Sequence, residues 1–266
     1  IFAHLAMARC MGVGSFAAAA VIGWTRLTHR RAARLILIAA VAANLALFLV
    51  TRWVWADRSM EPLALGIVSF LSIAFLVDVF RGEAAADRPL TAALALAPLP
   101  LLVAGPIVRY HDIRTQAGRR VVGMGPFIYG VRRFVIGLLK VTLVADVLDA
   151  PVTAIFSRHA SLLTMDAAWL GAGCLALQFY FRMSGWADMA IGLGRMIGFR
   201  FPESFRRPYT AESLRDFWRR WNITLMTGLR DYLHLPIAGR DNPTLALYVN
   251  VVFGFCVMGF WHGSGW

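Results

Sequence analysis

Residues 35–55 read LILIAAVAANLALFLVTRWVW, and this stretch decides the fold class. Its only strongly polar side chains are Asn44 and Arg52. A helix that crosses the hydrocarbon core of a bilayer needs about 20 predominantly apolar residues. The length and composition of the stretch therefore predict a transmembrane helix.

Further apolar runs lie on both sides of this stretch along the chain: Ile1–Trp24, Leu63–Phe80, Leu90–Val108, Phe127–Leu148, Ala167–Leu193 and Leu245–Trp261. The run Leu90–Val108 contains Pro98, Pro100 and Pro106, which would break a helix, so we expect a kinked or re-entrant element there. The set predicts an all-α, polytopic transmembrane helical bundle. We found no internal repeat or linker and expect one membrane domain, residues 1–266, as a fragment lacking both termini.

Composition supports a membrane protein. The chain of 266 residues is 59% hydrophobic and only 16% charged, whereas soluble domains average about 25% charged residues. The net charge is +12, but the arginines cluster between apolar runs, as in 26–34 and 114–120. Loops beside anionic lipid headgroups have this pattern. We therefore predict a lipid bilayer and no nucleic acid as partner. The three cysteines have no metal-ligand spacing, so no metal site is predicted.

The segment Thr210–Leu233 has a different pattern. Trp218 and Trp221 recur with other apolar residues at helical spacing, and arginines fall between them. This predicts one amphipathic helix at the membrane interface, with Thr210 as its N-cap. Such a helix is either a surface anchor alone or part of a functional site.

Ionisable groups are energetically costly within apolar runs, so their presence there indicates a structural or functional role. Asp188 lies in a stretch of small residues that lets helices approach closely, and a hydrogen bond or ion pair across helices would explain it. His262 follows the last apolar run between Trp261 and Gly263. An imidazole can take a proton from a hydroxyl near neutral pH, but a lone histidine in an apolar setting is more often a packed, hydrogen-bonded residue than a catalyst.

Several stretches form an ordered set: 105–110 (GPIVRY), 183–192 (MSGWADMAIG), 198–205 (GFRFPESF), 217–221 (FWRRW), 229–233 (LRDYL) and 261–263 (WHG). In this order they resemble the bacterial membrane-bound O-acyltransferases, and most strongly the branch that acts in alginate O-acetylation. The resemblance implies a bowl of helices around a central tunnel, with re-entrant and interfacial amphipathic helices. It also implies that His262 is the catalytic residue.

The same resemblance indicates further site residues, which would line the tunnel or stabilise an oxyanion: Asn222, Trp218, Trp221, Arg230, Asp231, Trp261, Ser184, Asp188, Arg109 and Tyr110. It implies no bound cofactor. An acyl thioester, either acyl-CoA or an acyl-carrier protein, would serve as co-substrate. The acyl group, acetyl by analogy with the branch, would move towards a hydroxyl of an exported polysaccharide or of a periplasmic or extracellular partner protein. The expected location is the bacterial inner membrane, with several spans.

Two alternatives stay open. Buried Arg and Asp side chains could line the path of a non-enzymatic transport or flippase component. The chain could also be an inactive family member, because the family usually has a second histidine where this sequence has Asn222. An asparagine can hydrogen-bond but cannot take a proton at neutral pH.

Overall fold

The computed structural model describes residues 2–54, 61–86, 88–96, 105–233 and 243–262, and within these ranges every regular element is a helix. The predicted all-α class is confirmed. The chain divides into two compact units. The first comprises residues 1–102, 107–119 and 223–266, and the second comprises residues 103–106 and 120–222. The expectation of a single membrane domain stays a prediction.

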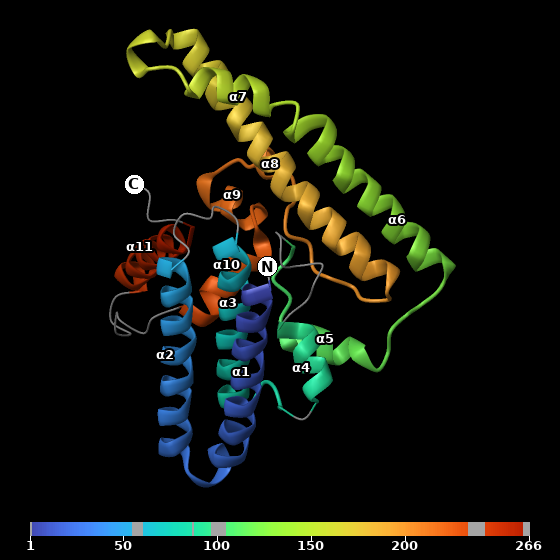
Figure 1. Cartoon of the computed structure of the whole chain (residues 1–266), viewed down its shortest axis with the longest axis vertical. Coiled ribbons are helices and arrows are strands. Elements are labelled where there is room, and N and C mark those ends of the chain that lie inside the picture. The colour runs from blue at the N-terminus through green and yellow to red at the C-terminus, as the bar shows by residue number, and fades with distance from the viewer. Residues whose placement is uncertain (1, 55–60, 87, 97–104, 234–242, 263–266) are drawn as a thin grey trace. The chain divides into compact units, whose positions relative to one another are not determined.

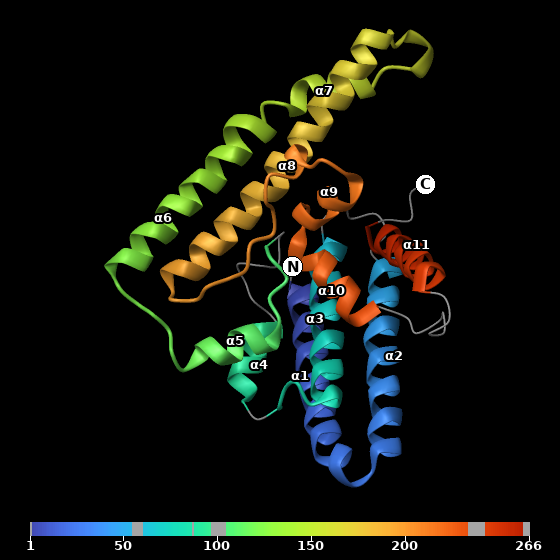
Figure 2. The same cartoon turned by 180° about the vertical axis from the view of Figure 1, so that it is seen from behind.

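The first unit is built around α3 (Glu61–Arg81), which lies beside α1 (Phe2–Thr28) and α2 (Arg30–Val54) in both views (Figures 1 and 2). The unit also contains α4 (Pro89–Leu96), α5 (Tyr110–Ala117), α10 (Ile223–Leu233) and α11 (Pro243–His262). Apolar side chains of α3 are buried on every face, among them Val68, Phe75, Leu76 and Val79. A helix that is apolar all round belongs in the middle of a bundle, and α3 takes that place.

The helices α1 and α2 form a hairpin that matches the first two predicted runs. Within them, Cys10–Thr28 and Arg30–Val50 are long and apolar enough to cross a membrane. The buried amide of Asn44 donates a hydrogen bond of 3.2 Å to Ser15 Oγ and links the two helices. Pairing of this kind spares two polar groups the cost of lying alone among apolar side chains. The number of further spans stays a prediction.

The proline-containing run is only partly described. It begins as the short helix α4, which ends at Leu96, before Pro98. Residues 97–104, including Pro98 and Pro100, lie outside the described residues. Ile107 beyond them is not helical, and its backbone N–H donates to Thr224 Oγ1 at 3.1 Å. An uninterrupted helix across the whole run is therefore excluded, while the re-entrant path stays a prediction.

The second unit is dominated by two long helices, α6 (Met124–Leu139) and α8 (Met165–Met196), which lie side by side (Figures 1 and 2). A π-helical segment η2 (Lys140–Ala145) and α7 (Asp149–Phe156) continue from α6 and also pack on α8. Short turns η3 (Ala160–Leu162) and η4 (Pro208–Thr210) and the helix α9 (Leu214–Arg220) complete the unit.

Glycines set the distance between α6 and α8. A Cβ added at Gly137 would lie 2.6 Å from the carbonyl oxygen of Gly185, and one added at Gly185 would lie 2.7 Å from that of Gly137. Gly130 and Gly192 approach each other equally closely at a second point along α6 and α8. Because only glycine leaves room at such an approach, the backbones themselves are in contact. The close approach expected around Gly185 is confirmed.

The prediction of one amphipathic helix over Thr210–Leu233 is wrong. The segment contains η4, then α9, then α10, with a break at Trp221 and Asn222. Thr210 is not the cap of α9, because Ser213 Oγ accepts the Asp216 N–H at 3.1 Å. Asn222 has a φ of 40°, in the left-handed region, and this ends helical geometry between the two helices. The helical spacing of apolar residues continues through the break, so the sequence pattern alone could not predict the break.

The glycine contacts give a test of helix packing. We expect Gly137→Ala to destabilise the protein by about 1–3 kcal/mol, because its new methyl group must displace backbone atoms of α8. Gly173→Ala is the matched control, since a Cβ there has no atom within 4 Å and alanine favours the helix. The measurement is thermal unfolding of the purified protein in detergent. Equal melting temperatures for the two variants would contradict the packing described.

Candidate functional site

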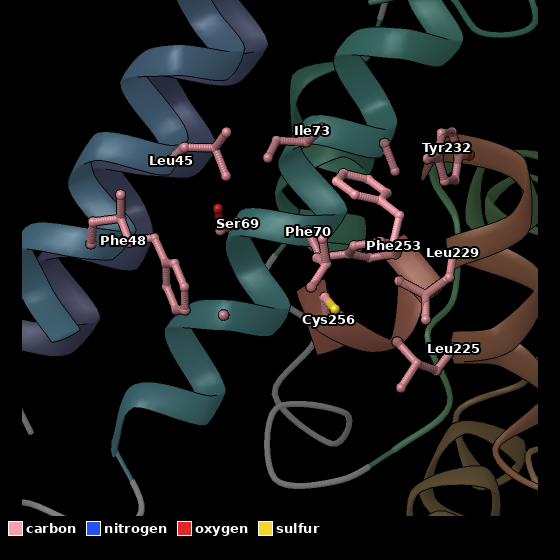
Figure 3. A pocket seen from close by; sticks show the side chains of 14 residues that line it. Leu45, Phe48, Ser69, Phe70, Ile73, Leu225, Leu229, Tyr232, Phe253 and Cys256 are labelled. Atoms are coloured by element: carbon pink, nitrogen blue, oxygen red, sulfur yellow. The ribbon is translucent and has the colours of Figure 1, made fainter. Parts of the chain in front are cut away.

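An apolar cavity of about 550 Å³ lies within the first unit (Figure 3). Its wall comes from α2, α3, α10 and α11: Leu45, Phe48, Leu49, Gly66, Ser69, Phe70, Ile73, Ala74, Leu225, Leu229, Tyr232, Phe253, Cys256 and Val257. Pockets for small molecules typically combine such an apolar lining with a few polar groups. Here the polar groups are the hydroxyls of Ser69 and Tyr232 and the thiol of Cys256. The cavity suits a hydrocarbon or acyl group.

The helix α11 connects this cavity to the predicted catalytic residue. It supplies Phe253, Cys256 and Val257 to the wall and continues without interruption to His262. At 1.5 Å rise per residue, the backbone of His262 stands about 9 Å along the helix axis from Cys256. The side chains of Trp261 and His262 lie outside the described residues, so the roles predicted for them stay predictions.

A polar network at the C-terminal end of α10 borders the cavity. The Tyr232 hydroxyl donates to both carboxylate oxygens of Asp78 on α3, at 2.8 and 3.0 Å. The guanidinium groups of Arg81 and Arg109 lie 5.7 and 5.2 Å from the centre of the Tyr232 ring. Both arginines also bind Asp231: Arg109 Nη2 contacts its carboxylate at 2.5 Å, and Arg81 Nη1 donates to its carbonyl at 3.1 Å.

This network brings three predicted site residues together: Arg109, Arg230 and Asp231. Arg230 Nε lies 3.1 Å from the Asp231 carboxylate. Partial burial alone would raise the pKa of Asp231, but hydrogen bonds from Arg109 and Arg230 outweigh it and hold this pKa below its ordinary value. Asp231 is therefore a fixed anion that orients two arginines. The structure gives Asp78 a partner on α10, the hydroxyl of Tyr232.

Tyr110, another predicted site residue, is packed in the core of the first unit. Its side chain is buried, and its ring centre lies 4.6 Å from that of Phe75. It begins α5 directly after Arg109, whose backbone N–H donates to the Asp112 carboxylate at 3.2 Å. Tyr110 thus anchors the helix start that positions Arg109.

In the second unit, Asp188 is the centre of an ionic network between α6 and α8. Its carboxylate contacts Arg133 Nη2 at 2.7 Å and Lys140 Nζ at 2.6 Å. Arg133 also donates to Glu203 Oε1 at 2.5 Å and binds its second oxygen. The ion pair across helices expected for Asp188 is confirmed. Ser184, one turn earlier, is buried, and its hydroxyl has no hydrogen-bond partner among the described residues.

Trp221 lies at the centre of an aromatic cluster. Its ring centre is 5.3–6.3 Å from those of five other residues: Phe179, Tyr180, Phe205, Tyr209 and Phe217. Trp218 packs edge-on against Phe217 at 5.3 Å. Edge-to-face and offset pairs of this kind each add about 0.5–1.5 kcal/mol beyond burial. The contacts describe Trp221 as a packing residue, and lining of a tunnel by Trp218 and Trp221 stays a prediction.

Asn222 directly follows this cluster and has its backbone in the left-handed region, with a φ of 40°. Asparagine, aspartate and histidine are the non-glycine residues most enriched there. The position therefore suits either the asparagine of this chain or the histidine usual in the family.

Sequence reasoning missed the partners of these residues. Arg133 and Lys140 lie in the apolar run Phe127–Leu148, and the rule that selected Asp188 could have selected them as well. Glu203 and Tyr232 fall in the stretches quoted above, but nothing local marks their function. The apolar cavity gives no sequence signal, because it depends on the packing of four helices.

The chain resembles known proteins over most of its length. A family model described as the membrane-bound O-acyltransferase family matches residues 27–266. The chain belongs to this family.

Curated relatives agree with the assignment. The chain is 41% identical over 209 residues to the probable alginate O-acetylase AlgI of Azotobacter vinelandii, covering 77% of this chain and 41% of that protein. It is 32% identical over 238 residues to the peptidoglycan O-acetyltransferase of Helicobacter pylori, covering 77% of this chain and 44% of that relative. The teichoic acid D-alanyltransferase of Bacillus subtilis is 26% identical over 95 residues, 33% of this chain and 24% of that protein. The chain thus spans less than half the length of these relatives.

Family membership and the apolar helices place the protein in a membrane. Among the described residues, no group of three or more His, Cys, Asp or Glu side chains could hold a metal ion. The expectation that the protein works without metal or bound cofactor stays a prediction.

The Asp188 network provides a stability test. We expect Asp188→Asn to destabilise the protein by about 3 kcal/mol or more, because it removes the shared anion from two largely buried cations. Asp146→Asn is the matched control, since Asp146 is exposed and pairs with Arg182 at 3.1 Å. That exposed pair contributes about 0–1 kcal/mol. Urea unfolding of both variants in detergent makes the comparison, and similar midpoints would refute the structural importance of the network.

Proposed function

We propose that the protein is part of a multi-pass O-acyltransferase of the bacterial inner membrane. It would move an acyl group, acetyl by similarity to the alginate and peptidoglycan relatives, from a thioester donor to a hydroxyl. The donor would be acyl-CoA or an acyl-carrier protein, and the acceptor an exported polysaccharide or a periplasmic or extracellular partner protein. The family match over residues 27–266 carries this proposal.

The proposed architecture is the family's bowl of helices around a tunnel, with a re-entrant element after α4. The apolar cavity of the first unit supports the presence of a chamber that can shelter an acyl group from water. Its wall includes α11, which ends at His262. The Arg109–Asp231 pair and Tyr232 give this chamber a fixed polar border.

In the proposed reaction, an imidazole nitrogen of His262 accepts the proton of the acceptor hydroxyl. The oxygen then attacks the thioester carbonyl carbon and forms a tetrahedral oxyanion. Collapse of this intermediate breaks the carbon–sulfur bond, and the departing thiolate receives the proton from the imidazolium. The Asn222 amide and the Arg230 guanidinium are candidate donors to the oxyanion.

The first test replaces the proposed base. His262→Ala and His262→Gln, made in the full-length protein, should lower the rate of acyl transfer by about 100-fold or more, since general bases contribute about 10²–10⁴. His159→Ala is the control, because His159 is exposed and bonds only Ser161 among the described residues. Transfer is measured as glycan acetylation at equal membrane levels of each variant. Unchanged acetylation in both His262 variants would refute the assignment.

A second test separates the backbone role of Asn222 from a chemical one. Asn222→Gly keeps a residue suited to positive φ and removes the amide. If the amide stabilises the oxyanion, kcat should fall by about 10²–10³ while the melting temperature is unchanged. Asn222→His, which also suits this φ, reports on the family's usual residue. Full activity of Asn222→Gly would show that Asn222 serves only the backbone of the helix break. If the wild-type protein is inactive and gains activity as Asn222→His, the inactive-member alternative is supported.

A further inference from the structure

A second cavity, of about 540 Å³, lies within the second unit, beside the Asp188 network. Residues of α6 and α8, Lys140 and the segment 203–207 line it: Tyr129, Arg132, Arg133, Ile136, Lys140, Tyr180, Asp188, Glu203, Phe205, Arg206 and Arg207. Cavities of this size hold ligands of the size of a nucleotide or smaller. The lining differs from that of the apolar cavity because most of its members are charged.

The charges of this lining do not balance. Asp188 and Glu203 are already bound by Arg133 and Lys140. Among the residues that the structure describes, no carboxylate pairs with Arg132, Arg206 or Arg207, although all three line the same cavity. Their exposed guanidinium groups give the cavity an excess of positive charge. Cationic groups gathered in one concavity attract anions more strongly than the same groups dispersed over a surface.

Two of these arginines lie on a segment that is held in place. Arg207 adopts a φ of 46° immediately before the buried Pro208, an unfavourable backbone that persists only when its surroundings fix it. The Arg206 N–H donates to the Arg220 carbonyl at 2.9 Å. The Tyr209 hydroxyl donates to the Ala176 carbonyl of α8 at 2.8 Å. The cations are therefore presented from a rigid frame, which lowers the entropy cost of binding.

We propose that this cavity binds the phosphate groups of a phosphorylated ligand through Arg132, Arg206 and Arg207. Guanidinium groups match phosphate oxygens in bidentate geometry and stay charged at every physiological pH. A diphosphate or a phosphate monoester carries enough charge to meet several arginines, whereas a single carboxylate does not. The ionic network around Asp188 is neutral overall, because Asp188 and Glu203 balance Arg133 and Lys140. It holds α6 and the segment 203–207, which carries Arg206 and Arg207, in fixed positions.

The phosphate has two possible sources, a soluble ester such as coenzyme A or the headgroup of an anionic lipid. In the first case the site would hold the polar end of a thioester donor, and the inference then rests on the proposed function. Binding itself needs no turnover. A failure of the site can therefore be told apart from a failure of acyl transfer, which is measured on His262 variants.

The experiment measures binding by the full-length protein in nanodiscs of phosphatidylcholine. Titration calorimetry with pyrophosphate and with coenzyme A gives Kd values, and native mass spectrometry after exchange into phosphatidylglycerol detects retained anionic lipid. Arg132→Gln and Arg206→Gln are compared with wild type. Arg158→Gln is the matched control, because Arg158 is exposed and lies outside the cavity.

We expect pyrophosphate or coenzyme A to bind the wild type, and each cavity variant to raise Kd about tenfold or more, as loss of a charge-assisted hydrogen bond does. Arg158→Gln should leave Kd unchanged, and added salt should weaken binding. Retention of phosphatidylglycerol alone, lost in Arg206→Gln, would assign the lipid headgroup as the source. No binding of any of the three probes, or equal effects of Arg206→Gln and Arg158→Gln, would overturn the proposal. Melting temperatures check that each variant is folded.

Discussion

The structure depends on one constraint, that a charge among apolar helices must be neutralised by a partner. In the second unit Asp188 meets it by sharing its carboxylate between Arg133 and Lys140, and so ties α6 and the start of η2 to α8. In the first unit the same constraint joins α3, the start of α5 and α10. In each unit, elements distant in sequence are thereby held in one relative position. The glycine contacts between α6 and α8 then allow the short distances that these ion pairs need.

The two cavities differ in the chemistry of their linings. The cavity between α2, α3, α10 and α11 has an almost entirely apolar lining and suits a hydrocarbon or acyl group. The cavity beside the Asp188 network is lined by cations and suits a phosphorylated group. Each cavity can therefore be examined by ligands that carry only one of these chemistries.

Much of the fold could be predicted because apolar length is a direct physical requirement. The runs around Leu35–Trp55 and Ala167–Leu193 became α2 and α8, and the charge on Asp188 correctly implied a partner across helices. The break at Asn222 could not be predicted, because the apolar period continues through it and only the backbone angle reveals it. The contacts of Glu203 and Tyr232 with these charged residues could not be predicted either, since a polar residue in a loop or at a helix end is ordinary. The resemblance supplied His262, which local physics left open between catalysis and packing.

The π-helical segment Lys140–Ala145 has a consequence for the length of the helix that α6 begins. A π turn accommodates about one residue more than an α turn, so it marks a place where a single residue can be inserted without breaking the helix. Removing one residue there would restore α geometry and leave the chain that follows in nearly the same rotational phase relative to α6, because the π turn already absorbs the extra residue. A deletion at this place would therefore keep the packing of α7 on α8. Lys140 is the first residue of the segment and pairs with Asp188, so the ion pair fixes the place along the helix where the extra residue is accommodated.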